Sequence, residues 1–392
     1  MTKPLNRQIA ALPTTIFTVM SELARAHDAI NLGQGFPDTE GPQDMVQVAA
    51  DALLDGRNQY APLTGLPELR RAVADSNARF QGLEIDAESE VVVTSGATEA
   101  LAAALMALIE PGDDVVLIEP LYDTYLPMVR QLGGIPRLVR LQEPGWTLPR
   151  EALAAAFSAR TKAILLNTPM NPTGKVFTTE ELDFIASLLR QHDAYAVCDE
   201  VYEHLTFNTP HVSLMSRPDM RERCLRIGSA GKSFSLTGWK VGYVTAPAPL
   251  AAVVAKAHQN LVFATAPNLQ RAVAFGLNKD DQYFQDLAAD MARKRDILSA
   301  GLRSVGLEVL PCDGSYFVMA DITPLANGLD DVAFARQLTE EAGVTTIPAS
   351  AFYDPANGTP PKHLVRFAFC KQDAVLQDAV ARIKHWASQK DG

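Results

Sequence analysis

Short apolar runs alternate with longer amphipathic segments along most of the chain between residues 42 and 227. The runs have the length of buried strands, whereas the segments between them carry apolar residues at the spacing of a helix. The expected strands are 91–94, 114–118, 135–138, 163–167, 194–198 and 225–227. The expected helices are 42–54, 67–79, one opening near residue 96, 121–132, 150–157 and 179–191. This alternation predicts an α/β fold whose mostly parallel sheet is covered by helices on both faces.

The pattern changes at residue 282, where a long, charge-rich helix begins and runs to about residue 303. Beyond it, the expected strands are 307–310, 315–321 and 364–369, and the expected helices are 332–342 and 371–388. This arrangement indicates a second, smaller domain of the α+β class. At the other end of the chain, an arm and a helix at 14–27 precede a short strand that starts at Ile30.

Composition excludes several classes of function. The chain has 392 residues, which is enough for more than one hydrophobic core. Its net charge of −11 and the absence of any Lys/Arg run argue against a nucleic-acid partner or an anionic membrane surface. No apolar run reaches the roughly 18 residues of a membrane span, and the N-terminus lacks the apolar core of a signal peptide. The four cysteines have neither disulfide nor metal spacing, so we expect free thiols, a cytoplasmic location and no bound metal.

Residues 228–242 place Lys232 among Gly, Ser and Thr, directly after an apolar strand. One interpretation is a glycine-rich turn with a solvated lysine. A P-loop is set aside, because Arg226 stands where that motif needs its first glycine. A third interpretation is a lysine that forms a Schiff base with pyridoxal phosphate, with Ser229 and Lys240 binding the phosphate group. The segment alone does not distinguish the first interpretation from the third.

Two further glycine-containing turns are ambiguous in the same way. Residues 95–101 lead from a strand into a helix, whose free N–H groups and positive dipole end form a natural phosphate site. An ordinary helix cap by Thr94 or Ser95 is the interpretation that the local sequence favours. Gly33 and Gly35 begin like a dinucleotide-binding fingerprint, but no third glycine follows at the required position. Gly35 therefore either allows close approach of a ligand or belongs to a plain turn.

Polar residues at strand ends are the remaining candidates. Asp199 follows a strand that is expected to be buried, so its carboxylate needs donors or a cation. It is either a helix cap, an arginine partner, or the counter-charge of a pyridinium nitrogen. Asn171 and Tyr202 are either structural residues or donors to a phenolate oxygen. Arg366 lies within a strand, where it either faces solvent, as the local pattern favours, or binds a carboxylate bidentately.

Taken together, these residues occur in a familiar order along nearly the whole chain: Tyr60, Gly96-Ala97-Thr98, Tyr122, Asn171, Asp199, Tyr202, Ser229, Lys232, Lys240 and Arg366. The order resembles the class I aminotransferases, which are pyridoxal-phosphate enzymes of fold type I. Segments 14–17, 34–38, 58–62 and 238–242 resemble the subgroup of methionine and kynurenine/glutamine aminotransferases. The resemblance implies a mostly parallel, mixed seven-stranded sheet between helices in a large domain (46–281). It also implies a smaller α+β domain (282–392), to which part of the N-terminal segment (1–45) belongs.

The resemblance also implies roles for individual residues toward pyridoxal 5'-phosphate. Lys232 holds the cofactor covalently and Asp199 pairs with its ring nitrogen. Tyr202 and Asn171 bond the phenolic oxygen, and Tyr122 stacks on the ring. The phosphate group is bound by residues from three segments and from the other subunit of a homodimer: Gly96, Ala97, Thr98, Ser229, Lys240 and the partner's Tyr60. Lys240 departs from many family members, which have arginine there; lysine keeps the charge but loses the bidentate fork.

For the substrate, the resemblance assigns the carboxylate to Gly35, Asn171 and Arg366, and the side-chain pocket to Ile16, Phe17 and Phe263. The implied reaction moves the amino group of methionine, or of an aromatic or other neutral amino acid, to a 2-oxo acid in ping-pong order. The alternative is a kynurenine/glutamine transaminase with cysteine-conjugate β-lyase activity. A ligand-sensing regulator on this fold would need a DNA-binding module, for which the N-terminal arm is too short.

Overall fold

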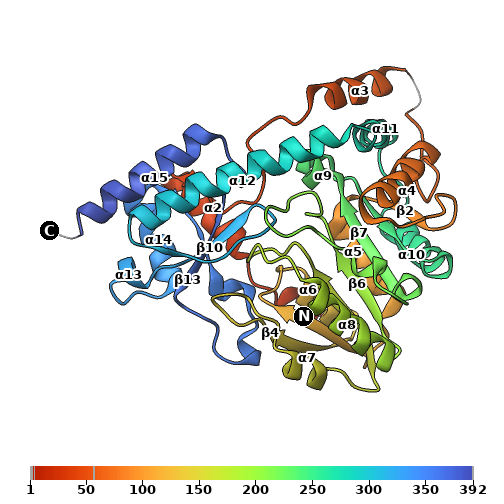
Figure 1. Ribbon diagram of the computed structural model, residues 1–392, viewed down its shortest axis with the longest axis horizontal. Helices are drawn as coiled ribbons and strands as arrows, with labels where there is room; N and C mark the ends of the chain where they lie inside the picture. The colour runs from red at the N-terminus through yellow and green to blue at the C-terminus, as the bar shows by residue number, and fades with distance from the viewer. Residues whose placement is uncertain (1–2, 4, 56–57, 391–392) are drawn as a thin grey trace.

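A seven-stranded sheet forms the centre of the larger part of the molecule, with strand order β2-β8-β7-β6-β5-β3-β4 (Figure 1). The computed structural model describes residues 3, 5–55 and 58–390, so residues 1, 2 and 4 of the expected N-terminal arm lie outside the described residues. The strands are β2 (Val91–Thr94), β8 (Gly242–Thr245), β7 (Cys224–Ser229), β6 (Tyr195–Asp199), β5 (Thr161–Asn167), β3 (Asp114–Glu119) and β4 (Ile135–Arg140). Neighbours from β7 to β4 pair in parallel, whereas β8 is antiparallel to β7 and to β2. The expected mostly parallel, mixed sheet is confirmed.

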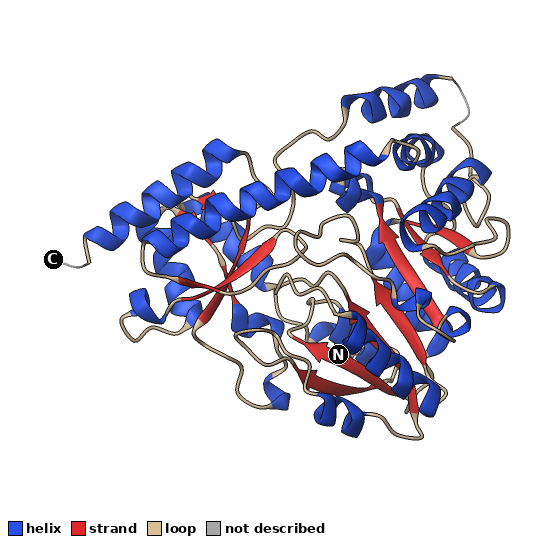
Figure 2. Ribbon diagram, viewed as in Figure 1, coloured by secondary structure: helices blue, strands red, loops and turns tan. Residues whose placement is uncertain are grey.

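Alternate residues of one strand enter two different hydrophobic cores, which is why the strands read as continuous apolar runs. In β3, Val115 and Leu117 pack into the core on one face, while Val116 and Ile118 pack into the core on the other. Figure 2 shows helices on both faces of this sheet. Those around it are α3 (Gln43–Leu54), α4 (Pro67–Gln81), α5 (Gly96–Leu108), α6 (Tyr125–Gln131), α7 (Arg150–Ala156), α8 (Thr179–Gln191), α9 (Ala230–Ser233), α10 (Ala248–Leu261) and α11 (Pro267–Leu277).

Some elements differ from the sequence-based expectation. Strand β8 and helices α10 and α11 were not predicted. Helix α6 begins at Tyr125, four residues after the predicted start at Leu121. The reason is a tertiary contact: the backbone N–H of Leu121 donates to the carbonyl oxygen of Phe352 (2.6 Å), which holds the chain in a turn before the helix begins.

A smaller sheet, with order β12-β13-β10-β9, faces the large sheet and carries Arg366 on a central strand. Its strands are β12 (Ile347–Pro348), β13 (Leu364–Ala368), β10 (Phe317–Asp321) and β9 (Glu308–Val309). Beside it, β1 (Ile30–Asn31) pairs in parallel with β11 (Val344–Thr345). The accompanying helices are α2 (Ile16–Ala26), α12 (Asp281–Ser304), α13 (Thr323–Ala326), α14 (Asp331–Ala342) and α15 (Asp373–Ser388), and a short α1 (Arg7–Ala10) precedes them.

The N-terminal segment thus belongs with the C-terminal part of the chain, because α2 packs on α14 and β1 pairs with β11. In Figure 1, the long helix α12 runs from the region of α14 and α15 toward α9 and α11. The predicted domain limits at residues 45 and 281 stay a prediction. None of the described helices is long and apolar enough to cross a membrane.

The register of the large sheet brings the ends of several strands to one edge. Asn167 at the end of β5 is paired with Asp199 at the end of β6. Gly242, the first residue of β8, is paired with both Ser229 at the end of β7 and Thr94 at the end of β2. Because ligands of such sheets bind at the carboxyl ends of the parallel strands, this edge is where a site is expected.

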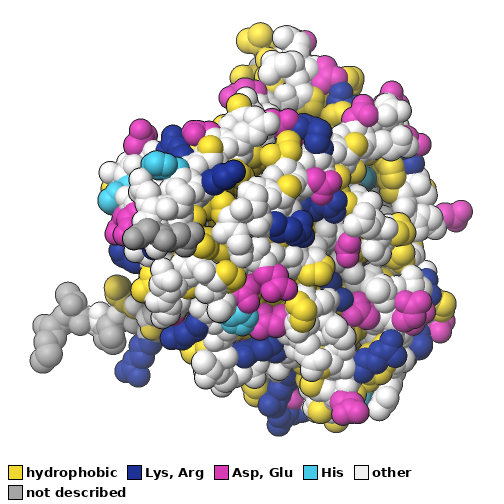
Figure 3. All heavy atoms as spheres, turned by 60° about the vertical axis from the view of Figure 1, so that its left-hand side comes forward, with side chains coloured by type: hydrophobic (Ala, Val, Ile, Leu, Met, Phe, Trp, Pro, Cys, Tyr) yellow, Lys and Arg dark blue, Asp and Glu magenta, His cyan; other side chains and the backbone are white. Residues whose placement is uncertain are grey.

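Charged residues occur both on the surface and in the interior. On the face seen in Figure 3, Lys and Arg side chains are interspersed with Asp and Glu. Arg217 and Asp183 form one exposed pair, with an N–O distance of 2.7 Å. In contrast, Arg226 is 2% exposed and its guanidinium pairs with both Glu200 (2.6 Å) and Glu203. Two buried carboxylates therefore share one buried arginine, and His211 and Ser213 also contact Glu200.

Replacing that arginine tests the buried cluster. Arg226→Met should lower the free energy of unfolding by about 3–5 kcal/mol, because the buried Glu200 and Glu203 would both lose the guanidinium that pairs with them. The matched variant Arg217→Met removes an exposed pair and should change stability by less than about 1 kcal/mol. The measurement is urea unfolding followed by circular dichroism. Equal effects of the two substitutions would contradict this account of the cluster.

Candidate active site

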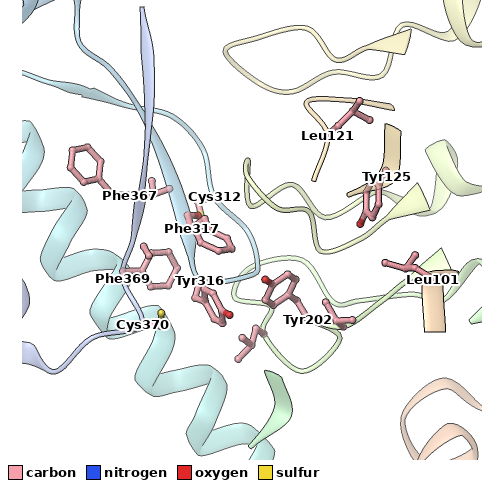
Figure 4. Packing of buried hydrophobic residues seen from close by; sticks show 14 of the residues in the cluster. Leu101, Leu121, Tyr125, Tyr202, Cys312, Tyr316, Phe317, Phe367, Phe369 and Cys370 are labelled. Atoms are coloured by element: carbon pink, nitrogen blue, oxygen red, sulfur yellow. The ribbon is translucent and has the colours of Figure 1, made fainter. Parts of the chain in front are cut away.

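A cavity of about 390 Å³ opens at the carboxyl edge of the large sheet, between that sheet and the smaller one. In Figure 4, Tyr316 and Phe317 lie beside Tyr202, and Tyr125 and Leu101 lie farther to the right. Most residues expected at the site line this cavity: Phe17, Gly35, Gly96, Ala97, Thr98, Tyr122, Asn171, Asp199, Tyr202, Ser229, Lys232, Lys240 and Arg366. Residues from eight separate segments are thus brought together by the fold.

One end of the cavity is the N-terminus of helix α5. Ser95 occupies the cap position but makes no side-chain capping hydrogen bond. The hydroxyl of Thr94 donates instead to the carbonyl oxygen of Gly96 (3.1 Å). The ordinary side-chain cap that the local sequence favoured is therefore wrong. The first N–H groups of a helix have no partner within the helix, so those of α5 are available to an anion together with the positive end of its dipole.

Two glycines bring a cation against this helix end. A Cβ atom on Gly242 would lie 2.6 Å from the carbonyl carbon of Gly96, so only glycine lets the two backbones approach so closely. A Cβ atom on Gly96 would lie 3.3 Å from the Nζ atom of Lys240. Ser229 is held beside them by its pairing with Gly242. A helix N-terminus, a lysine and a serine thus converge on one spot, which is a donor set suited to a phosphate group.

Lys232 lies in the middle of the cavity on the short helix α9. Its Nζ atom donates to the hydroxyl oxygen of Tyr316 (2.6 Å), and that hydroxyl donates to the carbonyl oxygen of Gly35 (2.5 Å). Desolvation lowers the pKa of Lys232 to about 8. The interpretation of Lys232 as a solvated turn residue is therefore wrong. An amine with a lowered pKa is suited to nucleophilic and acid–base chemistry near neutral pH.

Asp199 lies at the end of β6 and is 4% exposed. Its Oδ2 atom accepts a hydrogen bond from the hydroxyl of Tyr125 (2.5 Å), and its Oδ1 atom accepts a longer one from the backbone N–H of Val201 (3.4 Å). Among the described residues it forms no ion pair, so the expectation of an arginine partner is wrong. Desolvation raises the pKa of Asp199 to about 6, and the bond from Tyr125 opposes that rise.

Arg366 is 1% exposed, because the rings of Phe17, Phe317 and Phe352 surround its guanidinium. The expectation of a solvent-facing arginine is therefore wrong. Its guanidinium donates to the side-chain oxygen of Asn171 (2.7 Å) and to the carbonyl oxygen of Gly33 (2.6 Å), and it lies 3.9 Å from the ring centre of Phe317. The Nε atom is buried without a partner among the described residues.

Within the described part of the chain, Arg366 forms no ion pair. Burial lowers the pKa of its guanidinium to about 10. It therefore remains protonated at neutral pH. The carboxyl of Asp123, which also lines the cavity, attracts the guanidinium without forming an ion pair. A buried guanidinium that no ion pair neutralises is costly unless an anion completes it. This residue is accordingly suited to bind the carboxylate of a ligand in the cavity.

Three expected site residues do not line the cavity of this protomer. Tyr60 is 84% exposed, and its ring packs edge-on against Phe263 at 5.2 Å. Phe263 is itself 41% exposed. Ile16 is partly buried in a small cluster with Met20. The assigned roles of Tyr60, Phe263 and Ile16 stay predictions.

Sequence analysis missed two residues that contact the central groups. Tyr316 accepts from Lys232, but it comes from the smaller sheet and no local motif marks it. Tyr125 binds Asp199. Because Tyr122 precedes the helix that begins at Tyr125, helical spacing does not relate these two side chains, and no local signal marked Tyr125.

The donor set matches pyridoxal phosphate from end to end. The helix N-terminus with Lys240 and Ser229 suits its phosphate, the amine of Lys232 suits its aldehyde, and the Asp199 carboxylate suits its ring nitrogen. Arg366 lies beyond these groups, where it can hold a substrate carboxylate. The residues present therefore fit this cofactor.

Comparisons with known proteins agree. The family model for aminotransferase class I and II matches residues 27–383. The chain is 41% identical to methionine aminotransferase of Escherichia coli strain K12, over 96% of this chain and 97% of that protein. It is 38% identical to human kynurenine–oxoglutarate transaminase 1, over 93% and 94% of the two chains. The solved structure of N-succinyldiaminopimelate aminotransferase from Mycobacterium tuberculosis is 43% identical and superimposes with a TM-score of 0.94, covering 98% of this chain and 100% of that one.

The family match and the fold type I architecture extend over almost the whole chain, and the cavity holds the donors that the cofactor of this family requires. The chain therefore belongs to the class I and II aminotransferase family and is a pyridoxal-phosphate-dependent aminotransferase.

Proposed function

We propose that this enzyme transfers the amino group of methionine, and of aromatic and other neutral amino acids, to a 2-oxo acid in ping-pong order. The observation that carries the proposal is the charge distribution of the cavity. Its lining contains three cations, Lys232, Lys240 and Arg366, and no other Lys, Arg or His among the described residues. Lys232 is needed to hold the cofactor, Lys240 to bind its phosphate and Arg366 to bind the substrate's α-carboxylate. No cation in the lining is then left to bind an acidic substrate side chain.

Lys232 is the proposed attachment point of the cofactor, and Asp199 the counter-charge of its ring nitrogen. Bound pyridoxal phosphate supplies the electron sink for the carbanion that remains when the α-proton is lost. The amine of Lys232 removes that proton and returns it, a task for which its lowered pKa is suited. Tyr202 and Asn171 donate to the phenolic oxygen, and Tyr122 packs on the ring.

The remaining residues bind the two ends of the ligands. Ser229, Lys240 and the first turn of α5, with Gly96, Ala97 and Thr98, are proposed to bind the phosphate group. The substrate carboxylate is proposed to bind Arg366, next to Asn171 and Gly35. The contact between Arg366 and Asn171 (2.7 Å) supports this role, because it fixes the plane of the guanidinium before the substrate arrives.

Substrate preference then depends on what meets the side chain. Phe17, Tyr122 and Phe317 give the cavity an apolar and aromatic lining. A second carboxylate would be desolvated there without a cation. Since each buried methylene contributes only about 0.8 kcal/mol, discrimination among apolar side chains should be loose. Similarity to the methionine aminotransferase of E. coli supports methionine as a good donor.

The second candidate is a kynurenine/glutamine transaminase with cysteine-conjugate β-lyase activity. The aromatic lining and the similarity to the human kynurenine–oxoglutarate transaminase favour it. Transamination releases a 2-oxo acid, whereas β-elimination releases pyruvate and a thiol, so product analysis separates the two. N-succinyldiaminopimelate is a less suitable substrate, because its additional carboxylates would need cations that this protomer's cavity does not offer.

A homodimer is part of the proposal. Tyr60 and Phe263 are both exposed, yet their rings contact each other at 5.2 Å. This exposed aromatic pair is suited to a subunit boundary, where Tyr60 would reach the phosphate in the partner's site. The four cysteines are all buried and unpaired, which supports a cytoplasmic location.

Covalent labelling tests the attachment point. Borohydride reduction of the holoenzyme should fix the cofactor on the peptide that contains Lys232, because that amine is the one with a lowered pKa in the centre of the cavity. Mass spectrometry of a proteolytic digest locates the label, and Lys232→Ala serves as the control that should carry none. A label on Lys240 would overturn the assignment.

Subunit complementation tests the dimer. Tyr60→Ala should be weak in cofactor binding and Lys232→Ala inactive. Mixing the two under subunit exchange should restore up to about a quarter of wild-type activity, because half of randomly formed dimers would be hybrids with one intact site. Each variant mixed with itself is the control. A fully active monomer in light scattering would exclude the shared site.

A substrate series tests the preference. With one common oxo-acid acceptor, kcat/KM should be highest for methionine, lower for phenylalanine, leucine and glutamine, and lowest for aspartate. We expect aspartate to be disfavoured by at least about tenfold, since it would lose a solvated charge without gaining a cation. Aspartate reacting faster than methionine would refute the proposed substrate class.

A further inference from the structure

Tyr125 is a buried tyrosine that contacts Asp199 and has no role in the proposed reaction so far. It is the first residue of α6 and 3% exposed. Its ring packs edge-on against that of Tyr122, with centres 5.6 Å apart, and its backbone N–H donates to the carbonyl oxygen of Tyr122 (3.1 Å). The ring is therefore held by the turn before α6. In Figure 4 it lies on the same side of the cavity as Leu101.

The hydrogen bond between Tyr125 and Asp199 has a defined direction. Burial and the nearby Asp199 raise the pKa of Tyr125 well above its ordinary value, so the phenol keeps its proton and donates. Other titratable groups face Asp199 from several elements. Lys232 and the hydroxyl of Tyr125 favour the ionised carboxylate, whereas burial and Glu200 oppose it. The carboxylate also faces two further phenols of the cavity, Tyr122 and Tyr202.

The two oxygens of Asp199 are therefore not equivalent. Oδ2 is engaged by a short bond of 2.5 Å, while Oδ1 receives only the 3.4 Å contact from the backbone of Val201. We propose that Tyr125 is a positioning residue that fixes the Asp199 carboxylate through Oδ2, holds it ionised, and leaves Oδ1 for the ring nitrogen of pyridoxal phosphate. This inference rests on the proposed role of Asp199.

The consequence concerns the location of one proton. A carboxylate and a ring nitrogen in contact share a proton, and the group that is better stabilised in its charged form decides where it resides. With the Tyr125 bond, Asp199 is the weaker base and the nitrogen stays protonated. Without that bond, the buried carboxylate becomes more basic and takes the proton. The ring nitrogen then loses the positive charge that makes it an electron sink.

A packing role for Tyr125 predicts a different result, because Phe would fill the same space. The chain contains a matched control: Tyr243 is 1% exposed, and its hydroxyl has no hydrogen-bond partner among the described residues. Tyr243→Phe and Tyr125→Phe remove the same atom from equally buried rings. A difference between them reports the hydrogen bond rather than the loss of a buried hydroxyl.

The experiment measures the nitrogen-15 chemical shift of ring-labelled pyridoxal phosphate in the holoenzyme. Wild type and Tyr243→Phe should show a protonated nitrogen, and Asp199→Asn an unprotonated one. Tyr125→Phe should move most of the way toward the Asp199→Asn value. Its kcat should fall by about 10- to 100-fold with little change in KM, because a hydrogen bond to a charged group is lost.

The outcomes separate the inference from the function it rests on. If Asp199→Asn keeps a protonated nitrogen, the proposed role of Asp199 fails. If Asp199→Asn loses the proton but Tyr125→Phe matches wild type, Asp199 keeps its role and the inference about Tyr125 is overturned. Should Tyr125→Phe fold poorly, 4-aminophenylalanine at position 125 keeps the ring and a weaker donor. It should displace the chemical shift in the same direction by less, and an unchanged shift would again overturn the inference.

Discussion

A buried arginine without an acid partner is the interaction on which the rest of the site depends. Arg366 is held by an amide oxygen, a backbone carbonyl and aromatic rings, which orient the guanidinium but form no ion pair with it. An ion pair within the protein would have stabilised the free enzyme and blocked the ligand. Without such a pair, the charge stays available to the substrate carboxylate that we propose Arg366 binds.

The same burial acts on the two titratable groups at the centre of the cavity. Free Asp and Lys side chains titrate about 6.5 pH units apart. Here desolvation raises the pKa of Asp199 to about 6 and lowers that of Lys232 to about 8, so only about two units separate them. One physical cause, removal of water, thus brings an acid and a base of opposite charge into the range where both exchange protons at neutral pH.

Local patterns in the sequence were sufficient for most of the fold. Helix α8 was predicted with its observed limits from apolar residues at helical spacing, and the structure shows a capping box between Thr178 and Glu181 at its start. The strands of the large sheet could be predicted because helices cover both faces of the sheet, so each strand is a continuous apolar run. Arg366 was misjudged, since nothing within its strand shows that Phe17 and Phe352, from distant segments, cover it. Tyr316 was missed for the same reason: its contact with Lys232 joins residues 84 positions apart, and local periodicity carries no information about such pairs.

The pairing of strand β8 limits where residues can be inserted into the chain. Its first residue, Gly242, is fixed in register against the ends of both β7 and β2. The segment that leaves β7 at Ser229 and returns at Gly242 is therefore tied at both ends, and Lys232 and Lys240 lie within it. Surface connections usually tolerate inserted residues, but here one extra residue would shift one lysine against the other. The length of this segment is therefore fixed. We expect residues 229–242 to tolerate some substitutions of side chains but no insertion or deletion of residues.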